Sequence, residues 1–248
     1  MANYKQMLYD IEVHSVEGIR QYFKDGGNPN EMHNGIPLFT TFVEMYTRTP
    51  RFKDCVKEFI KAGLEFEDKA LLAVLADDAD KLKDIIGYDP AVVFNTWSVF
   101  NNTHTPLRGA TLLHFCAEYN SEACAEVLVA CGADVNAKAG LDENGFGGHT
   151  PIFHTVNQNN NNSADMLTFL LENGADLSIT VKGLIWGKGY EWETFIPAVN
   201  PVSYAMMGLL PQMHRKEKTV AAVVSMLIKH TYGIDYTPTN VPCAYLKS

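Results

Sequence analysis

The chain has 248 residues, and its 46% hydrophobic and 20% charged residues are ordinary for a folded protein. Twenty basic and 29 acidic residues give a net charge of −9, which argues against binding to nucleic acid phosphates but leaves a basic protein partner open. No apolar run approaches the roughly 20 residues of a membrane span, and residues 1–10 lack a signal-peptide core, so we expect no membrane contact and a cytoplasmic location.

Two short helices are predicted at the start of the chain, over residues 4–13 and from Val16 to Lys24, and Gly26 follows the second. Residues 7, 4 and 3 positions before Gly26 are Ile19, Tyr22 and Phe23, which form one apolar helix face. The same spacing gives apolar residues before five later positions, namely Gly63, Asp89, Gly132, Gly174 and Thr231. Six windows with one common spacing indicate internal repetition.

A second short helix precedes each later window, and four of these helices begin alike. They start at Ile36-Pro37, Thr111-Leu112, Thr150-Pro151 and Asn200-Pro201, and each carries an apolar residue two or three positions on. A Thr or Asn oxygen can accept a free N–H at a helix start, and proline is tolerated in the first turn. A helix pair of this size cannot bury its apolar stripes alone, so the pairs are expected to stack.

These motifs resemble the ankyrin repeat, whose pattern is Thr-Pro-Leu-His-x-Ala followed by Leu-Leu-x-x-Gly-Ala-Asp-Val-Asn. The best matches are Thr111, Leu113 and His114 with the run from Cys131 to Asn136, and Thr150-Pro151 with the run from Asn173 to Asp176. The resemblance implies an all-α fold, an ankyrin-repeat solenoid of stacked antiparallel helix pairs, with β-hairpin or long-loop fingers between repeats. It implies one domain over 1–248, with repeats at about 4–34, 35–67, 68–108, 109–147, 148–198 and 199–236 and a tail at 237–248.

Three connections between repeats are longer than the repeat of about 33 residues requires. The extra sequence lies in 95–108, 137–148 and 178–199, which correspond to fingers in the ankyrin fold. Repeat 3 departs most from the pattern, because Tyr88-Asp89-Pro90 replaces Gly-Ala-Asp.

Aromatic residues gather in the enlarged fingers and are the candidate partner contacts, since aromatic side chains dominate interface hot spots. The candidates are Trp97, Phe100, Phe146, Trp186, Tyr190 and Trp192, and Phe195 lies with them. The alternative is that long fingers use aromatic residues to pack on one another, and the sequence leaves both open.

Catalytic and metal sites are not expected. His114 and Cys116 would point about 200° apart on a helix and cannot bind one ion. The resemblance implies that His114 is structural, bonding between repeats, and the same is expected of His154. The run from Asp142 to Gly148 lacks the alternating ligands of a calcium loop and reads as a turn, and no nucleophile or phosphate-binding motif occurs.

Five cysteines at Cys55, Cys116, Cys124, Cys131 and Cys243 include no Cys-x-x-Cys pair, so we expect reduced thiols. Asn136 matches the asparagine that is hydroxylated in some animal ankyrin repeats, although a backbone-bonding role at the base of a finger is favoured. Glu65, Glu67 and Asp68 form a small acidic cluster that could meet a basic surface.

The sequence therefore predicts a monomeric, non-catalytic protein interaction module without cofactors, whose concave face and fingers bind another protein. Two alternatives remain open at this stage. One is a regulatory inhibitor, immunity or host-directed effector protein on the same scaffold, and the other is a ligand-binding or enzymatic site in the long fingers.

Overall fold

The computed structural model describes residues 2–100, 105–186, 191, 193–207 and 216–238. Its α-helices are α1 (Tyr4–Glu12), α2 (Val16–Lys24), α3 (Leu38–Val43), α4 (Phe52–Lys61), α5 (Lys69–Ala76), α6 (Ala79–Tyr88), α7 (Leu112–Tyr119), α8 (Glu122–Ala130), α9 (Ala164–Glu172), α10 (Pro201–Met207) and α11 (Glu217–Tyr232). Short 3-10 helices are η1 (Pro90–Phe94), η2 (Pro151–His154) and η3 (Asn159–Asn161).

Two antiparallel two-stranded sheets accompany the helices, so the expectation of an all-α fold is corrected to a mainly helical fold with small sheets. The first sheet pairs β1 (Met32–His33) with β2 (Ile36–Pro37). The second pairs β3 (Val181–Trp186) with β4 (Thr194–Val199), so that Val181 lies opposite Val199 and Trp186 opposite Thr194. Both hairpins lie between one helix pair and the next.

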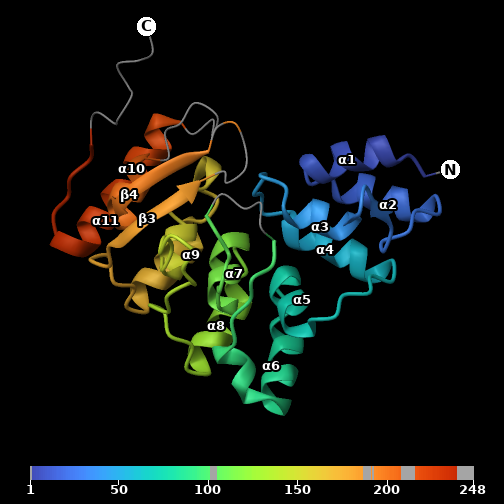
Figure 1. Ribbon diagram of the computed structural model, residues 1–248, viewed down its shortest axis with the longest axis horizontal. Coiled ribbons are helices and arrows are strands. Elements are labelled where there is room, and N and C mark those ends of the chain that lie inside the picture. Colours follow the sequence, from blue (N-terminus) through green and yellow to red (C-terminus); the bar gives the residue numbers. More distant parts are fainter. Residues whose placement is uncertain (1, 101–104, 187–190, 192, 208–215, 239–248) are drawn as a thin grey trace, which may run out of the picture.

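The helix pairs form an arch (Figure 1). Helices α1–α4 make one arm, α7–α11 and the β3–β4 hairpin make the other, and α5 and α6 lie at the base between them. Helix α7 packs against α5 and α8 on one side and against η2 on the other, which places this helix inside the stack. All eight of its residues are buried.

The common spacing found in the sequence correctly predicts the buried faces of the outer helices. Ile19, Val56, Leu82, Leu128 and Leu167 are fully buried. Among the other positions of this spacing, Ile60 is 41% exposed, and Phe23, Ile85, Val129 and Ile228 are partly buried.

The last helix does not stop at Thr231. Helix α11 ends at Tyr232 and is capped by Gly233 at φ 68°, a left-handed conformation that glycine adopts without a steric penalty.

The inner helix of repeat 5 is shorter than the sequence predicts, because η2 replaces a full α-helix. The side chain of Gln158 explains part of this difference. Its Nε2 donates to the carbonyl of His154 at 3.2 Å, the group that the backbone N–H of Gln158 would reach in a continuing α-helix. The same nitrogen also donates to Ala117 and Glu118 in α7, so this turn is fastened to the preceding repeat.

Two asparagine side chains, those of Asn136 and Asn30, form hydrogen bonds between neighbouring repeats. Asn136 donates to the carbonyl of Gly174 at 3.0 Å and accepts from the backbone N–H of Asp176 at 2.8 Å. Asn30 donates to Gly63 at 3.0 Å and accepts from Glu65 at 2.7 Å. The structural role favoured for Asn136 from the sequence is therefore observed, and it recurs at the other end of the chain.

We expect Asn136→Ala to lower the free energy of unfolding by about 1–2 kcal/mol, because it removes two hydrogen bonds between repeats. Urea unfolding followed by far-ultraviolet circular dichroism measures the change. Asn144→Ala is the matched control, since this exposed side chain lies in a turn, and its effect should stay within about 0.5 kcal/mol. Equal effects of the two substitutions would contradict the bridging role.

Candidate partner-binding surface on the fingers

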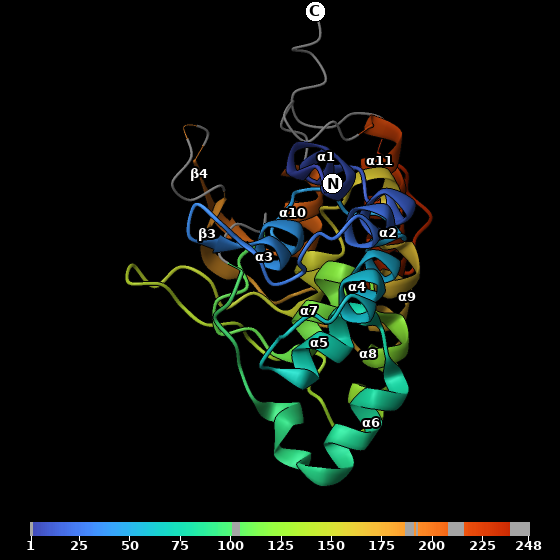
Figure 2. The same ribbon diagram turned by 90° about the vertical axis from the view of Figure 1, so that its right-hand side faces the viewer.

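The fingers are the segments that link one repeat to the next. We number them finger 1 (28–37), finger 2 (62–68), finger 3 (95–110), finger 4 (137–149) and finger 5 (178–199). Figure 2 shows the β3–β4 hairpin of finger 5 and the yellow-green loop of finger 4 projecting on one side of the molecule, away from α4, α8, α9 and α11. The fingers therefore form a surface separate from the outer helices.

Backbone hydrogen bonds connect fingers 3, 4 and 5 into one unit. The N–H of Gly140 donates to Arg108 at 2.8 Å, and the N–H of Gly147 donates to Gly183 at 3.0 Å. Gly109 has φ 60°, and a Cβ atom added there would lie 2.7 Å from the Cα of Gly140. Fingers 3 and 4 thus approach so closely that a side chain at Gly109 cannot be accommodated without a shift.

Trp97 and Phe100 in finger 3 pack inside the molecule. Trp97 is partly buried, its Nε1 donates to Asp68, and its ring meets Phe115 edge-on. Phe100 is only 6% exposed and lies between the rings of Phe66 and Phe115. Both residues fit the packing alternative, and Phe100 offers almost no surface to a partner.

Phe146 and Phe195 join fingers 4 and 5. Their ring centroids are 4.7 Å apart, Phe146 is partly buried, and Phe195 is 50% exposed. The ammonium group of Lys182 lies 5.1 Å from the centre of the Phe146 ring. This cluster fastens two fingers together and still presents aromatic surface to solvent.

Three candidate contact residues of finger 5 lie wholly or partly outside the described part of the chain. Tyr190 and Trp192 lie outside the described residues, as does the side chain of Trp186, although the backbone of Trp186 ends strand β3.

Exposed apolar side chains occur on most fingers, and several are residues that the sequence analysis did not single out. They are Met32 (60% exposed) and Ile36 (46%) in finger 1, Val99 (36%) in finger 3, Leu141 (58%) in finger 4 and Phe195 (50%) in finger 5. Four of the five are not aromatic, so a search for aromatic residues could not find them. Because contiguous exposed apolar patches mark interaction sites, these five residues are the apolar candidates for partner contact on the fingers.

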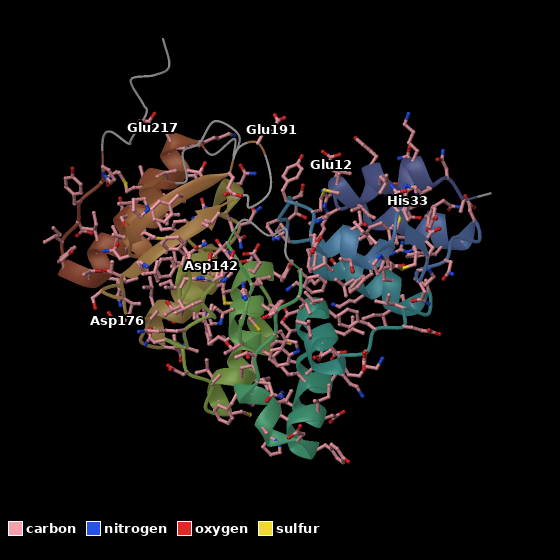
Figure 3. All side chains as sticks on the ribbon, viewed as in Figure 1. Glu12, His33, Asp142, Asp176, Glu191 and Glu217 are labelled. Atoms are coloured by element: carbon pink, nitrogen blue, oxygen red, sulfur yellow. The ribbon has the colours of Figure 1, made fainter. Side chains whose placement is uncertain are left out.

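Exposed acidic side chains also occur on the fingers. Glu65 and Glu67 in finger 2 are exposed, and Glu191 extends from the chain between β3 and β4 (Figure 3). Asp68 is engaged inside the molecule, where it caps α5 and accepts from Trp97. The acidic cluster expected in finger 2 is thus divided between a structural residue and two exposed carboxylates.

Asp142 forms the turn of finger 4. Its Oδ1 accepts from the backbone N–H groups of Asn144 at 2.8 Å and Phe146 at 2.9 Å. The carboxylate therefore organises its own loop, as the turn interpretation predicts. Among the described residues, no group of three or more His, Cys, Asp or Glu side chains could hold a metal ion.

A second concentration of polar side chains is buried in the stack and faces no solvent. The Nδ1 of His114 accepts from the N–H of Thr111 at 3.1 Å, so its Nε2 donates to the carbonyl of His149 at 3.1 Å. This bond joins repeats 4 and 5, in agreement with the structural role expected for His114. Burial lowers the pKa of His114 to about 3, with a further contribution from His154. Burial also lowers the pKa of His149 well below its usual value.

The thiols in the described part of the chain are free. Cys55, Cys116 and Cys124 are buried, and Cys131 is exposed. Burial raises the pKa of Cys55 to about 12 and that of Cys116 well above its usual value, so these two thiols are poor nucleophiles. Cys243 lies outside the described residues.

Comparison with models of known families finds ankyrin repeats, in three copies, over residues 50–181. The match covers more than half of the chain and leaves out α1–α3 and the region after β3 begins. A search of curated proteins finds no match. None of the helices in the described part combines the length and apolarity that a membrane crossing needs.

We expect Gly109→Ala to destabilise the protein by about 1–3 kcal/mol, because the new methyl group meets the backbone of Gly140 and the residue keeps a positive φ. Thermal unfolding measures this. Gly87→Ala in α6 is the control, since a Cβ there meets nothing within 4 Å, and it should leave stability unchanged or raise it by up to about 1 kcal/mol.

We also expect stability to fall as the pH decreases from about 6.5 towards 4. Burial and the charges of Arg48 and Arg51 lower the pKa of His14 to about 4, and the pKa of His114 is about 3. The unfolded chain therefore binds more protons than the folded one in this window, so the stability present above about pH 6.5 is lost on acidification.

Urea unfolding at about pH 7.5 and pH 5 should differ by about 2 kcal/mol for each of these two histidines. His14→Gln should reduce the difference, whereas His230→Gln, at an exposed position of α11, should not change it. The same pH dependence in wild type and His14→Gln would refute this assignment.

Proposed function

The chain belongs to the ankyrin-repeat family, whose members are generally protein interaction modules, and we propose that it binds a protein partner through its fingers without catalysing a reaction. The observation that carries the proposal is the set of exposed apolar side chains Met32, Ile36, Val99, Leu141 and Phe195. They come from four fingers that are spread along the arch, so a partner that follows the fingers would contact several repeats at once.

The bonding between fingers supports the same proposal. Because the described parts of fingers 3, 4 and 5 are joined by backbone bonds, and because Phe146 packs on Phe195, these parts are held together before a partner arrives. A preformed surface loses little conformational entropy on binding. Trp186, Tyr190 and Trp192 stay proposed contacts, since they belong to the same finger as Phe195 in the sequence.

The partner that we propose is basic. The exposed Glu65, Glu67 and Glu191 place negative charge on fingers 2 and 5, and the whole chain has a net charge of −9. Positively charged segments would be steered towards such a surface, and the steering would weaken as salt is added. Exposed apolar residues would then supply affinity, and the carboxylates would supply the rate and the selectivity of association.

The test begins with a partner captured by the immobilised chain and then purified, so that binding can be titrated between two defined proteins. We expect Leu141→Ser combined with Phe195→Ser to weaken binding at least tenfold, or about 1.4 kcal/mol, because both side chains would lose apolar contact area. Isothermal titration calorimetry measures the dissociation constants. Added salt should weaken binding of the wild type.

Tyr88→Ser is the matched control. Tyr88 is 94% exposed at the end of α6 and lies outside the fingers, and its side chain is larger than that of Leu141. Its replacement should change the dissociation constant less than twofold. A larger effect of Tyr88→Ser than of the finger variant would place the interface elsewhere. Trp186→Ala with Trp192→Ala tests the rest of finger 5, and unchanged affinity for every partner would remove these residues from the proposal.

A further inference from the structure

Among the connectors inside repeats that the structure describes in full, two are unusually long, and they meet. The connector between paired helices has three residues or fewer in repeats 1, 3 and 4. It has eight residues in repeat 2 (44–51), and nine residues separate η2 from α9 in repeat 5 (155–163). The Nδ2 of Asn162 donates to the carbonyl of Arg48 at 2.8 Å. In a regular array each repeat contacts only its neighbours, so a bond from repeat 2 to repeat 5 is not part of ordinary stacking.

A buried carboxylate strengthens this contact. Arg48 approaches Oε1 of Glu118 in α7 with its Nε at 2.9 Å and its Nη2 at 2.8 Å. The other oxygen, Oε2, lies 2.7 Å from Nδ1 of His154 in η2. All three side chains are almost completely buried. Glu118 therefore connects the connector of repeat 2 to repeat 5 from its position in repeat 4.

Tyr119, the next residue along α7, completes the contact. The Arg48 guanidinium lies 4.8 Å from the centre of its ring, and Phe52 of α4 stacks on that ring with a centroid distance of 4.6 Å. The Tyr119 hydroxyl donates to the carbonyl of Val43 at 3.2 Å. The end of α7 is thus held by residues on both sides of the connector 44–51.

Helix stacking joins the two arms through α5, which packs against α4 on one side of the turn and against α7 on the other. Helix α4 packs against α2 and α5, whereas α6 packs against α5 and α8. The arms meet at α5 and α6, where Figure 1 shows the arch turning. The contact of Arg48 with Asn162 and Glu118 is a second connection across this turn, in addition to the helix packing.

We propose that the connectors 44–51 and 155–163 form a strap, closed on Glu118, that sets the curvature of the arch. The strap has two states because a partly broken one is unfavourable. When Arg48 leaves Glu118, burial of an unpaired charge is costly, so Arg48 moves fully into water. Opening would let the arm of α1–α4 move away from repeats 4 and 5, and finger 1 would move away from finger 5. A partner that contacts both fingers would then select one state.

The experiment measures the distance between the arms in the full chain. One spin label is attached to the exposed Cys131 at the end of α8, and the other to Lys24→Cys in α2, with Cys243→Ser to remove a third site. The buried thiols Cys55, Cys116 and Cys124 are shielded from the labelling reagent. Pulsed electron paramagnetic resonance gives the distance distribution. The closed strap predicts one narrow distribution for the parent protein.

Arg48→Met should lengthen and broaden this distribution, with a shift of about 5 Å or more, the size of a one-turn slip between packed elements. Arg20→Met is the matched control, because Arg20 pairs with Glu58 of α4 at 3.0 Å inside one arm. This control should leave the distance unchanged. An Arg48→Met protein with native circular dichroism and an unchanged distance would overturn the proposal.

Two milder variants keep the test decisive if Arg48→Met does not fold. Arg48→Lys keeps the charge but loses the planar group that stacks on Tyr119, and Asn162→Ala removes only the bond to the Arg48 carbonyl. Each should broaden the distribution towards longer distances, and Arg48→Lys should do so more strongly. Parent-like distributions in both would show that stacking sets the curvature, and the strap would be rejected whether or not the fingers bind a partner.

Discussion

Every helix pair in this chain has more apolar surface than it can bury alone, and the fold follows from that constraint. Helix α7 shows it best, because it packs against α5, α8 and η2 and all eight of its residues are buried. Each added neighbouring repeat buries more apolar surface, which stabilises the folded state by about 25 cal/mol per Å². The loss of conformational entropy opposes the folding of a single short helix pair. The stack is therefore cooperative, and a repeat whose inner helix is irregular, such as repeat 5 with η2, is stabilised by the repeats beside it.

Each polar side chain that is buried inside the stack requires a hydrogen-bonding or charged partner. His114 stays neutral, with one ring nitrogen accepting from Thr111 and the other donating to His149, so it serves as a spacer with fixed hydrogen bonds. Glu118 is buried with Arg48 against one carboxylate oxygen and His154 against the other. Both solutions join elements from different repeats. Buried polar side chains thus define which repeats lie together, whereas apolar side chains supply most of the free energy.

The sequence predicted the parts of the fold that depend on local spacing. Ile19, Val56 and Leu82 are buried because each belongs to a helical stripe that must face a neighbour. It could not predict that Arg48 meets Glu118, 70 residues further on, since a loop carries no periodic signal. Nor could it decide how finger residues point. An aromatic side chain is equally suited to bind a neighbouring finger, as Phe100 does, or a partner, and only the three-dimensional arrangement separates the two.

Some apolar residues of the fingers pack inside the protein, and others are exposed to solvent. Rings of Trp97, Phe100 and Phe146 fasten one segment to the next, which leaves Val99 and Leu141 exposed beside them. This arrangement fixes positions within fingers 3 to 5 but not the distance from them to finger 1, because that distance depends on the angle between the arms. The affinity of a partner that spans the arch would therefore depend on two separate properties of the protein. Local packing would set the shape of each contact, and the curvature would set whether all contacts can form together.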